Sequence, residues 1–200
     1  MDDFRFNVCI VGLGLIGSSY AQALKTVNKG KVIGIDINEG TIKKAIEKGI
    51  IDEGYIDTKD ALEEADIVIL AVYPELTGKF VIDNMDFFKK GAIITDSAGI
   101  KENIINKINT CIRDDIDFIG GHPMAGKEGS GIENSSETIF KGANYLITPT
   151  DKNSEENIII IENMARKIGC KNVVRISPSE HDRIIAYTSH LPHIMAVALM

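Results

Sequence analysis

The sequence predicts an α/β protein with a doubly wound, mostly parallel sheet, followed by the start of an α-helical domain. Three observations support this prediction. Short apolar runs alternate with longer amphipathic segments, a glycine-rich turn directly follows the first of those runs, and a helix-capping pattern begins at Ser177. Continuous apolar runs are typical of strands that are buried on both faces, as in parallel sheets covered by helices.

Strand and helix patterns follow one another in a regular order. Apolar, β-rich runs predict strands at 7–12, 31–36, 66–72, 92–96 and 117–121. Amphipathic periodicity predicts helices near 15–27, 39–48, 75–88 and 101–111. A further strand at 144–148, a helix at 154–168 and a strand at 172–176 come next. This alternation indicates right-handed crossover connections between parallel strands.

The pattern changes at the end of the last predicted strand. Ser177 suits a helix N-cap and Pro178 the first helical position, with a glutamate three residues after the cap. A long helix is expected to follow and to bend near Pro192, because a proline removes one backbone hydrogen bond. We therefore expect one domain over 1–176, and the first helix of a C-terminal helical domain over 177–200.

The composition argues against several classes of partner. The formal net charge is −7 and no dense block of lysine and arginine occurs, so neither nucleic acid nor an anionic membrane is expected. The N-terminus is acidic where a signal peptide is basic, and no apolar run reaches the roughly 18 residues of a membrane span. The three cysteines form no CxxC or Cys/His cluster, so no metal is expected. We expect a cytoplasmic protein that binds a small molecule.

A glycine-rich turn, VGLGLIG, lies between the first predicted strand and the first predicted helix. Gly12 permits a tight turn, Gly14 lets a pyrophosphate approach the backbone, and Gly17 lets the helix pack against the strand. The free N–H groups of the helix N-terminus favour phosphate at this place. This pattern is a Rossmann-type dinucleotide fingerprint, and a structural turn without nucleotide is the alternative. The predicted cofactor-binding residues of the turn are Gly12, Leu13, Gly14, Leu15, Ile16 and Gly17.

Asp36, at the end of the second predicted strand, favours NAD as the cofactor. Its carboxylate suits the ribose hydroxyls and repels the 2′-phosphate of NADP. NADP is the less favoured alternative, through Lys43 or Lys44. Val72 and Tyr73 follow the third predicted strand and are expected to contact the cofactor at the same sheet edge, although a surface position would suit Tyr73 equally well.

His122 stands in the segment GGHPMAG, just after a predicted strand. The neighbouring glycines allow close backbone approach and Pro123 restricts the chain, so the imidazole is held still, as a general base requires. A neutral imidazole with a pKa near 7 accepts a proton, and the rate is then expected to rise with pH through a pKa near 6–7. A structural histidine in a turn is the alternative.

A second histidine cluster, SHLPH, lies on the last predicted helix. Ser189 and His193 are four residues apart and therefore share one helix face. Histidines with Arg183 nearby suit recognition of a carboxylate, whereas a solvated helix face is the alternative. No third ligand at helical spacing supports a metal site here.

Four segments together resemble the prephenate dehydrogenase family, which includes arogenate dehydrogenases. They are VGLGLIGSSYAQAL, GGHPMAGKEGSGIE, IFKGANYLITP and EHDRIIAYTSHLPH, in the family's order from about residue 7 to residue 200. The resemblance implies NAD- or NADP-dependent oxidative decarboxylation of prephenate to 4-hydroxyphenylpyruvate, on the route to tyrosine. By this likeness His122 matches the catalytic histidine that hydrogen-bonds the ring hydroxyl. Three positions match residues that line the family's substrate pocket: Ser189, His190 and His193.

The segment TDSAGIK departs from the family pattern. Family members often carry a serine at the position of Gly99, where it helps to orient the catalytic histidine and the substrate. Either Ser97 takes this role from two residues away, or the role is lost. Both residues are therefore candidate substrate-binding positions.

Other functions remain open at this point. An arogenate dehydrogenase or another β-hydroxyacid-type dehydrogenase would share the glycine turn, and a non-catalytic NAD-binding regulator would bind cofactor without turnover. The sequence ends on HIMAVALM, an apolar helix without a cap. Family members continue into a larger helical domain that forms a dimer and contributes a substrate-binding arginine. We therefore expect a truncated helical domain here, and a homodimer for the complete protein.

Overall fold

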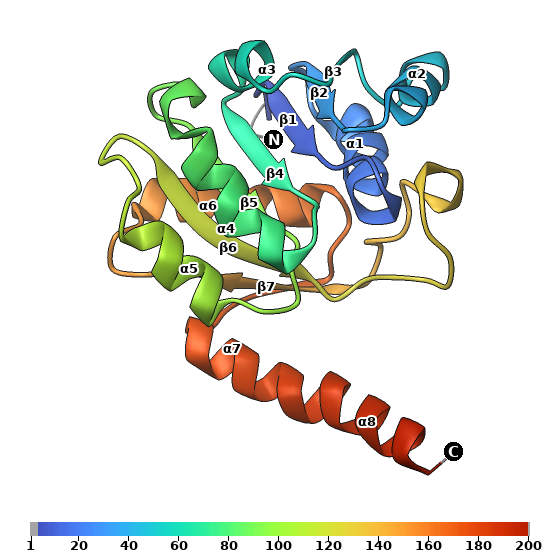
Figure 1. The fold of residues 1–200 in the computed structure, drawn as a ribbon, viewed down its shortest axis with the longest axis vertical. Coiled ribbons are helices and arrows are strands. Elements are labelled where there is room, and N and C mark those ends of the chain that lie inside the picture. The colour runs from blue at the N-terminus through green and yellow to red at the C-terminus, as the bar shows by residue number, and fades with distance from the viewer. Residues whose placement is uncertain (1–3, 200) are drawn as a thin grey trace.

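The structure, a computed structural model, describes residues 4–199 and confirms the predicted α/β class (Figure 1). Within these residues a single eight-stranded sheet has the order β3-β2-β1-β4-β5-β6-β7-β8. Neighbouring strands pair in parallel except β6 and β7, which are antiparallel. The strands are β1 (Val8–Val11), β2 (Val32–Ile35), β3 (Glu53–Tyr55), β4 (Ile67–Leu70), β5 (Ile93–Asp96), β6 (Asp117–Pro123), β7 (Asn144–Thr148) and β8 (Asn172–Arg175).

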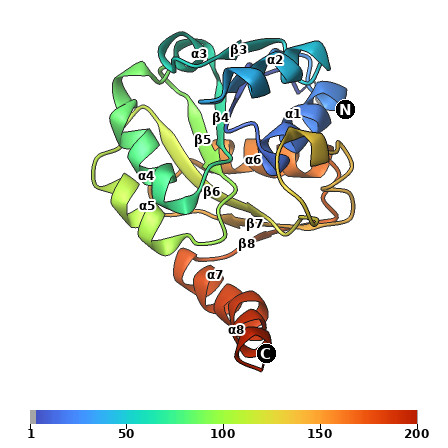
Figure 2. The ribbon, with the colours of Figure 1, turned by 45° about the vertical axis from the view of Figure 1, so that its right-hand side comes forward.

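Helices cover both faces of the sheet, as a doubly wound fold requires. The α-helices are α1 (Leu15–Val27), α2 (Glu39–Glu47), α3 (Lys59–Glu64), α4 (Pro74–Asp83), α5 (Glu102–Asn109), α6 (Glu155–Lys167), α7 (Pro178–Ile185) and α8 (Leu191–Ala198). Alternate residues of β1 enter different cores: Val8 and Ile10 pack with α1, α2 and α6, whereas Cys9 and Val11 pack with α3, α4 and α5. Figure 2 shows α4 and α5 on one side of the sheet, with α1 and α6 on the other.

Three local features differ from the sequence-based prediction. The prediction missed β3 and α3, because Glu53–Tyr55 is a short, half-buried edge strand without an apolar run and α3 has only six residues. Helix α4 ends earlier than predicted, where the side-chain amide of Asn84 donates to the carbonyl of Phe80 at 2.9 Å, and a 3₁₀ turn (Met85–Phe87) follows. Strand β6 continues to Pro123, because its second half pairs with β7 after its first half has paired with β5.

The C-terminal helix begins as predicted. The hydroxyl of Ser177 accepts a hydrogen bond from the N–H of Glu180 at 3.3 Å, and Pro178 occupies the first turn. A π-helical turn (Ala186–His190) joins α7 to α8, directly before Pro192. The wider turn accommodates the position where a proline lacks its N–H. The bend predicted near Pro192 is therefore replaced by a π-helical turn, and Figures 1 and 2 show α7 and α8 along one rod that projects from the sheet.

None of the helices within 4–199 combines the length and the apolarity that crossing a bilayer requires.

Candidate active site

A cavity of about 890 Å³ lies at the carboxyl ends of β1, β2, β4 and β5. The strand order reverses direction between β1 and β4, and open α/β sheets bind ligands in the crevice at such a point. Residues that follow each of the strands β1 to β6, together with residues of α4, form the wall of the cavity. Lining residues that the sequence singled out are Gly12, Gly14, Leu15, Ile16, Asp36, Val72, Tyr73, Ser97 and Gly99.

The glycine turn has the geometry that a dinucleotide requires. Gly12 has a φ of 88°, and a Cβ there would lie 2.6 Å from the carbonyl oxygen of Ala71. A Cβ at Gly17 would lie 1.8 Å from the carbonyl oxygen of Gly12, so helix α1 can approach the turn only without a side chain. Gly14 differs, because a Cβ there would meet no atom within 4 Å. It faces open space in the cavity and starts α1, where no side chain caps the N–H groups.

Two of the predicted cofactor-binding residues do not line the cavity. Leu13 has a fully buried side chain in the core, and only its backbone N–H takes part, donating to Asp36 at 2.8 Å. Gly17 is buried in the packing of α1 against the turn. The cavity therefore does not reach the side chain of Leu13, because the strand–helix turn aims that side chain into the core.

Asp36 connects the end of β2 to the glycine turn through hydrogen bonds of its carboxylate. Besides the N–H of Leu13, its carboxylate accepts the N–H of Asn38 at 2.9 Å. A carboxylate has about four lone-pair directions, so it keeps acceptor capacity toward the cavity. Lys44, considered above as a phosphate ligand, instead forms an exposed ion pair with Glu133 at 3.1 Å.

The outer part of the cavity is apolar and was not predicted from the sequence. Ile37 is 97% exposed beside Asp36, and Ile56 and Leu76 also line the cavity with exposed side chains. Tyr73 is 77% exposed at the cavity mouth. Apolar side chains left in water around a cavity are typical of a ligand site, here one suited to a flat aromatic ring. Isolated isoleucines in loops give no sequence signal of this kind.

His122 lies on strand β6 and not in the loop after it, which corrects the sequence-based placement. It pairs with Leu146 of β7 in the antiparallel ladder. The two glycines before it have the role expected of them: a Cβ at Gly120 would lie 2.2 Å from the hydroxyl of Thr148, and one at Gly121 would lie 2.6 Å from the hydroxyl of Tyr145. The imidazole is thus fixed by sheet pairing as well as by its neighbours.

The imidazole of His122 contacts a second histidine. Its Nδ1 lies 2.8 Å from Nε2 of His181, which is fully buried at the start of α7. Nδ1 of His181 lies 2.7 Å from the carboxylate of Asp182. The sequence analysis did not assign His181 or Asp182 to the site of His122. Strand β6 and helix α7 are far apart in the sequence and come into contact only in the folded protein. The available signal was the polar pair His181–Asp182 in the first turns of an amphipathic helix.

A buried ion pair lies beneath His122. Lys101 and Asp96 both have fully buried side chains, and the ammonium donates to Asp96 at 2.5 Å and to the carbonyl of Ala98 at 2.7 Å. The other carboxylate oxygen of Asp96 accepts the N–H of Gly121, next to His122, at 3.1 Å. Asp96 and Lys101 were not predicted as site residues, because nothing in the segment TDSAGIK indicates that its lysine side chain is buried.

These surroundings determine the charge of each group. Burial, the Lys101 ammonium and His181 lower the pKa of His122 from 6.5 to about 3, with Asp182 acting in the opposite direction. The sequence had suggested a value near 7, and the difference arises because burial disfavours the imidazolium. Burial also lowers the pKa of His181, against the effect of Asp182. Both imidazoles are therefore neutral at pH 7.

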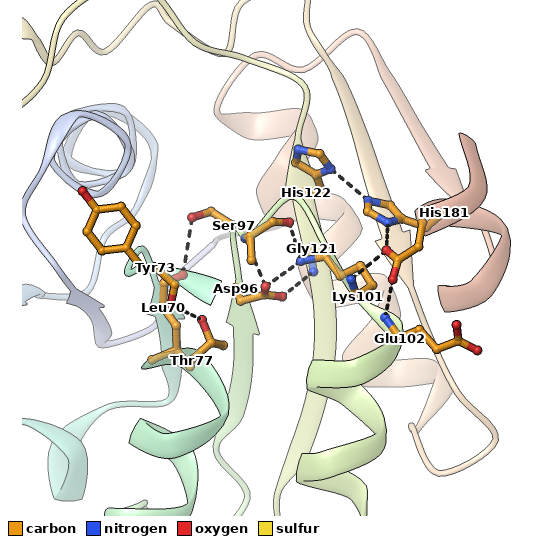
Figure 3. Close-up of polar contacts among 12 residues, drawn as sticks. Leu70, Tyr73, Thr77, Asp96, Ser97, Lys101, Glu102, Gly121, His122 and His181 are labelled. Carbon is orange, nitrogen blue, oxygen red and sulfur yellow. Dashed lines mark hydrogen bonds and ion pairs between the residues drawn. The ribbon is translucent and has the colours of Figure 1, made fainter. Parts of the chain in front are cut away.

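Gly99 lies directly beside the imidazole of His122. A Cβ at Gly99 would lie 3.8 Å from Cε1 and 3.9 Å from Nε2 of His122. Ser97 does not take the place of a side chain there, because its hydroxyl donates to the carbonyl of Leu70 at 3.4 Å, on the side away from His122 (Figure 3). Gly99 also lines the cavity, so the His122 ring lies next to a residue of the cavity wall.

The structure does not bring the second predicted cluster to His122. Ser189, His190 and His193 are exposed on the projecting rod of α7 and α8, outside the cavity wall. Within 4–199, His122 and His181 interact with each other, whereas His190 and His193 have no hydrogen bond to either of them. No three His, Cys, Asp or Glu side chains among the described residues are grouped so as to hold a metal ion.

Two family models match the chain. Residues 20–174 match the prephenate dehydrogenase nucleotide-binding domain, and residues 177–200 match the prephenate dehydrogenase dimerization domain.

Similar proteins and solved structures belong to the same family as these two models. The chain is 32% identical over 203 residues to a prephenate dehydrogenase of Bacillus subtilis (strain 168), covering 100% of this chain and 54% of that protein. A solved structure of prephenate dehydrogenase from Aquifex aeolicus, in complex with hydroxyphenyl propionate and NAD+, superposes with a TM-score of 0.90 and 31% identity, covering 100% of this chain and 68% of that one. Arogenate dehydrogenase from Synechocystis gives a TM-score of 0.89 and 32% identity, with coverages of 96% and 67%. The chain spans about half the length of the curated relatives it matches.

Proposed function

Because the chain belongs to the prephenate dehydrogenase family, we propose that the complete protein oxidises and decarboxylates prephenate with NAD as the hydride acceptor. The observation that carries this proposal is the position of His122, fixed on β6 with its ring beside Gly99, which lines the cavity. Arogenate is the second candidate substrate, since the Synechocystis relative is an arogenate dehydrogenase.

In this proposal residues 1–176 are the nucleotide-binding domain, and 177–200 begin the helical domain through which the complete protein dimerises. The cavity suits a dinucleotide because Gly14 leaves room beside the uncapped start of α1, which would hold the pyrophosphate. Asp36 would bind the adenosine ribose, and the apolar wall around Ile37 would hold the adenine ring. In the Aquifex aeolicus relative, whose structure contains NAD+, the same fold holds this cofactor.

His122 acts as the proton acceptor. Bound NAD supplies the electron-pair acceptor for a hydride from the ring carbon that bears the hydroxyl. As that hydride leaves, the hydroxyl becomes strongly acidic, so even an imidazole with a lowered pKa accepts its proton. Loss of the ring carboxylate as carbon dioxide then leaves an aromatic phenolate, which takes the proton back from His122, and the gain of aromaticity drives the reaction. From the family resemblance alone, we keep Ser189, His190 and His193 as candidate substrate ligands in the complete protein; here they are exposed and outside the cavity wall.

Turnover by the complete protein tests this proposal directly. With NAD and prephenate we expect reduced cofactor to accumulate, followed by its absorbance, together with release of carbon dioxide. Parallel reactions with arogenate and with NADP determine the substrate and the cofactor. NAD binding without turnover of either substrate would identify a non-catalytic NAD-binding protein and refute the proposal.

Replacing Asp36 tests the cofactor assignment. We expect Asp36→Ala to weaken NAD binding by about 1–3 kcal/mol, typical of a charge-assisted hydrogen bond, and to relax discrimination against NADP. Dissociation constants for both cofactors, measured by titration calorimetry, check this expectation. Asp114→Ala is the matched control, since Asp114 is exposed just before β6, at the opposite edge of the sheet. An unchanged NAD affinity in Asp36→Ala would contradict the assignment.

A further inference from the structure

His181 and Asp182 have no part in the mechanism so far, yet they lie in contact with the proposed base. His181 is fully buried, and its Nε2 is the side-chain partner of His122 Nδ1 among the described residues. Burying an imidazole beside another one is costly unless each ring nitrogen has a suitable hydrogen-bond partner. The pairing therefore needs a donor and an acceptor on the two facing nitrogens.

Asp182 determines which nitrogen donates. Its carboxylate accepts the N–H groups of Lys101 at 2.7 Å and Glu102 at 2.9 Å, at the start of α5. Partial burial alone would raise the pKa of Asp182, but these amides and His181 outweigh that effect and lower it. An ionised carboxylate can only accept hydrogen bonds. Nδ1 of His181 therefore carries a proton and donates it to Asp182 at 2.7 Å.

We propose that His181 and Asp182 form a positioning relay that holds His122 in the tautomer with the proton on Nδ1 and a bare Nε2. The neutral His181 has one proton, on Nδ1, so its Nε2 accepts from Nδ1 of His122. Nε2 of His122 then has its lone pair free. Figure 3 shows this nitrogen on the side of the ring away from His181, and it lies near the Gly99 wall of the cavity.

The relay rests on the proposed function for its catalytic meaning. In that reaction the O–H bond of the substrate breaks and a new N–H bond forms at Nε2 of His122. No proton needs to leave Nδ1, because the imidazolium of His122 continues to donate to His181. Asp182 stabilises the positive charge of His122 through the ring of His181, which lies between them. The remaining charged groups around the histidine pair, Lys101 and Asp96, neutralise one another at 2.5 Å. Asp182 thus supplies the net negative charge beside the two rings.

The test combines a spectroscopic signature with kinetics in the complete protein. In ¹⁵N-histidine-labelled protein at pH 7, long-range ¹H–¹⁵N correlations distinguish a protonated Nδ1 from a protonated Nε2. The His122 signals are identified by their absence in His122→Asn. We expect wild-type His122 to show a protonated Nδ1 and a bare Nε2.

His181→Leu removes the acceptor while leaving a buried apolar side chain. We expect the His122 proton to move to Nε2, kcat to fall by roughly 10–100-fold, as is typical when a supporting partner is lost, and the KM for NAD to stay within about twofold. His181→Gln keeps an acceptor oxygen, so it should restore most of the Nδ1-protonated form of His122 and most of kcat. Glu180→Gln, an exposed neighbour on α7, is the charge control and should match wild type.

Each outcome has a defined meaning. If His181→Leu folds but leaves His122 protonated on Nδ1, or leaves kcat unchanged, the relay is refuted. If the tautomer moves as expected while wild type turns over neither prephenate nor arogenate, the relay stands and the proposed function fails. Should His181→Leu not fold, Asp182→Asn applies the same test, because a neutral amide no longer holds the proton of His181 on Nδ1.

Discussion

We expect His122→Asn to lower turnover of the complete protein by roughly 10²–10⁴-fold, the contribution of a positioned general base. Asparagine is polar and of similar reach, but it cannot take a proton at neutral pH. Its amide can still donate to Nε2 of His181, so the buried pair keeps a partner. NAD affinity and melting temperature should therefore change little. Single-turnover rates, NAD titration and thermal unfolding on one preparation check this result.

The pH dependence of the wild type provides a second measurement of the same residue. In the proposed mechanism His122 acts in its neutral form, and its surroundings lower its pKa from 6.5 to about 3. The acidic limb of kcat/KM should therefore lie below pH 6 instead of at the ordinary histidine value. The free energy of unfolding should also decrease as the pH falls below about 6.5. In that range the imidazole of His122 binds a proton in the unfolded chain, whereas in the folded chain it does so only near its lowered pKa. Circular dichroism at each pH separates unfolding from loss of the base.

A structural histidine would give the opposite pattern in His122→Asn. Melting temperature would drop while the rate per folded molecule stayed near that of wild type. That result would remove His122 from the mechanism.

Local patterns were sufficient to predict most of the fold. The apolar runs at 7–12 and 66–72 became central strands, because strands buried on both faces need continuous apolar residues. The capping pattern at Ser177 predicted the start of α7 correctly. β3 was missed because an edge strand needs no such run, and its residues Glu53–Tyr55 are only half-buried.

The candidate site was predictable only in part, and the reason is the distance along the chain between its members. Gly12 and Gly14 belong to one local motif that the sequence shows by itself. The contact of His122 with His181 joins β6 to α7 across 59 residues, and no local periodicity encodes it. Leu13 was assigned to the cofactor because it stands inside the motif, whereas the turn directs its side chain into the core.

The buried pair of Lys101 and Asp96 leads to a large expected effect on stability. Lys101→Met removes the ammonium but leaves the Asp96 carboxylate fully buried, accepting only backbone N–H groups of Ala98 and Gly121 at 3.1 Å each. Leaving one partner of a buried ion pair without the other costs roughly 3–5 kcal/mol. We expect the free energy of unfolding, measured in urea, to fall by about that amount.

Two comparisons separate burial from the ion pair itself. Lys25 and Asp52 also lie 2.5 Å apart, but their side chains are 35% and 36% exposed, so Lys25→Met should cost only about 0–1 kcal/mol. The double variant Asp96→Asn with Lys101→Met also removes the unpaired carboxylate charge, so it should regain part of the lost free energy of unfolding. Equal losses for Lys101→Met and Lys25→Met would contradict the argument, since the two pairs differ in burial and not in distance. A large loss confined to Lys101→Met would mean that burial, and not the distance between the charges, determines the cost of losing one partner.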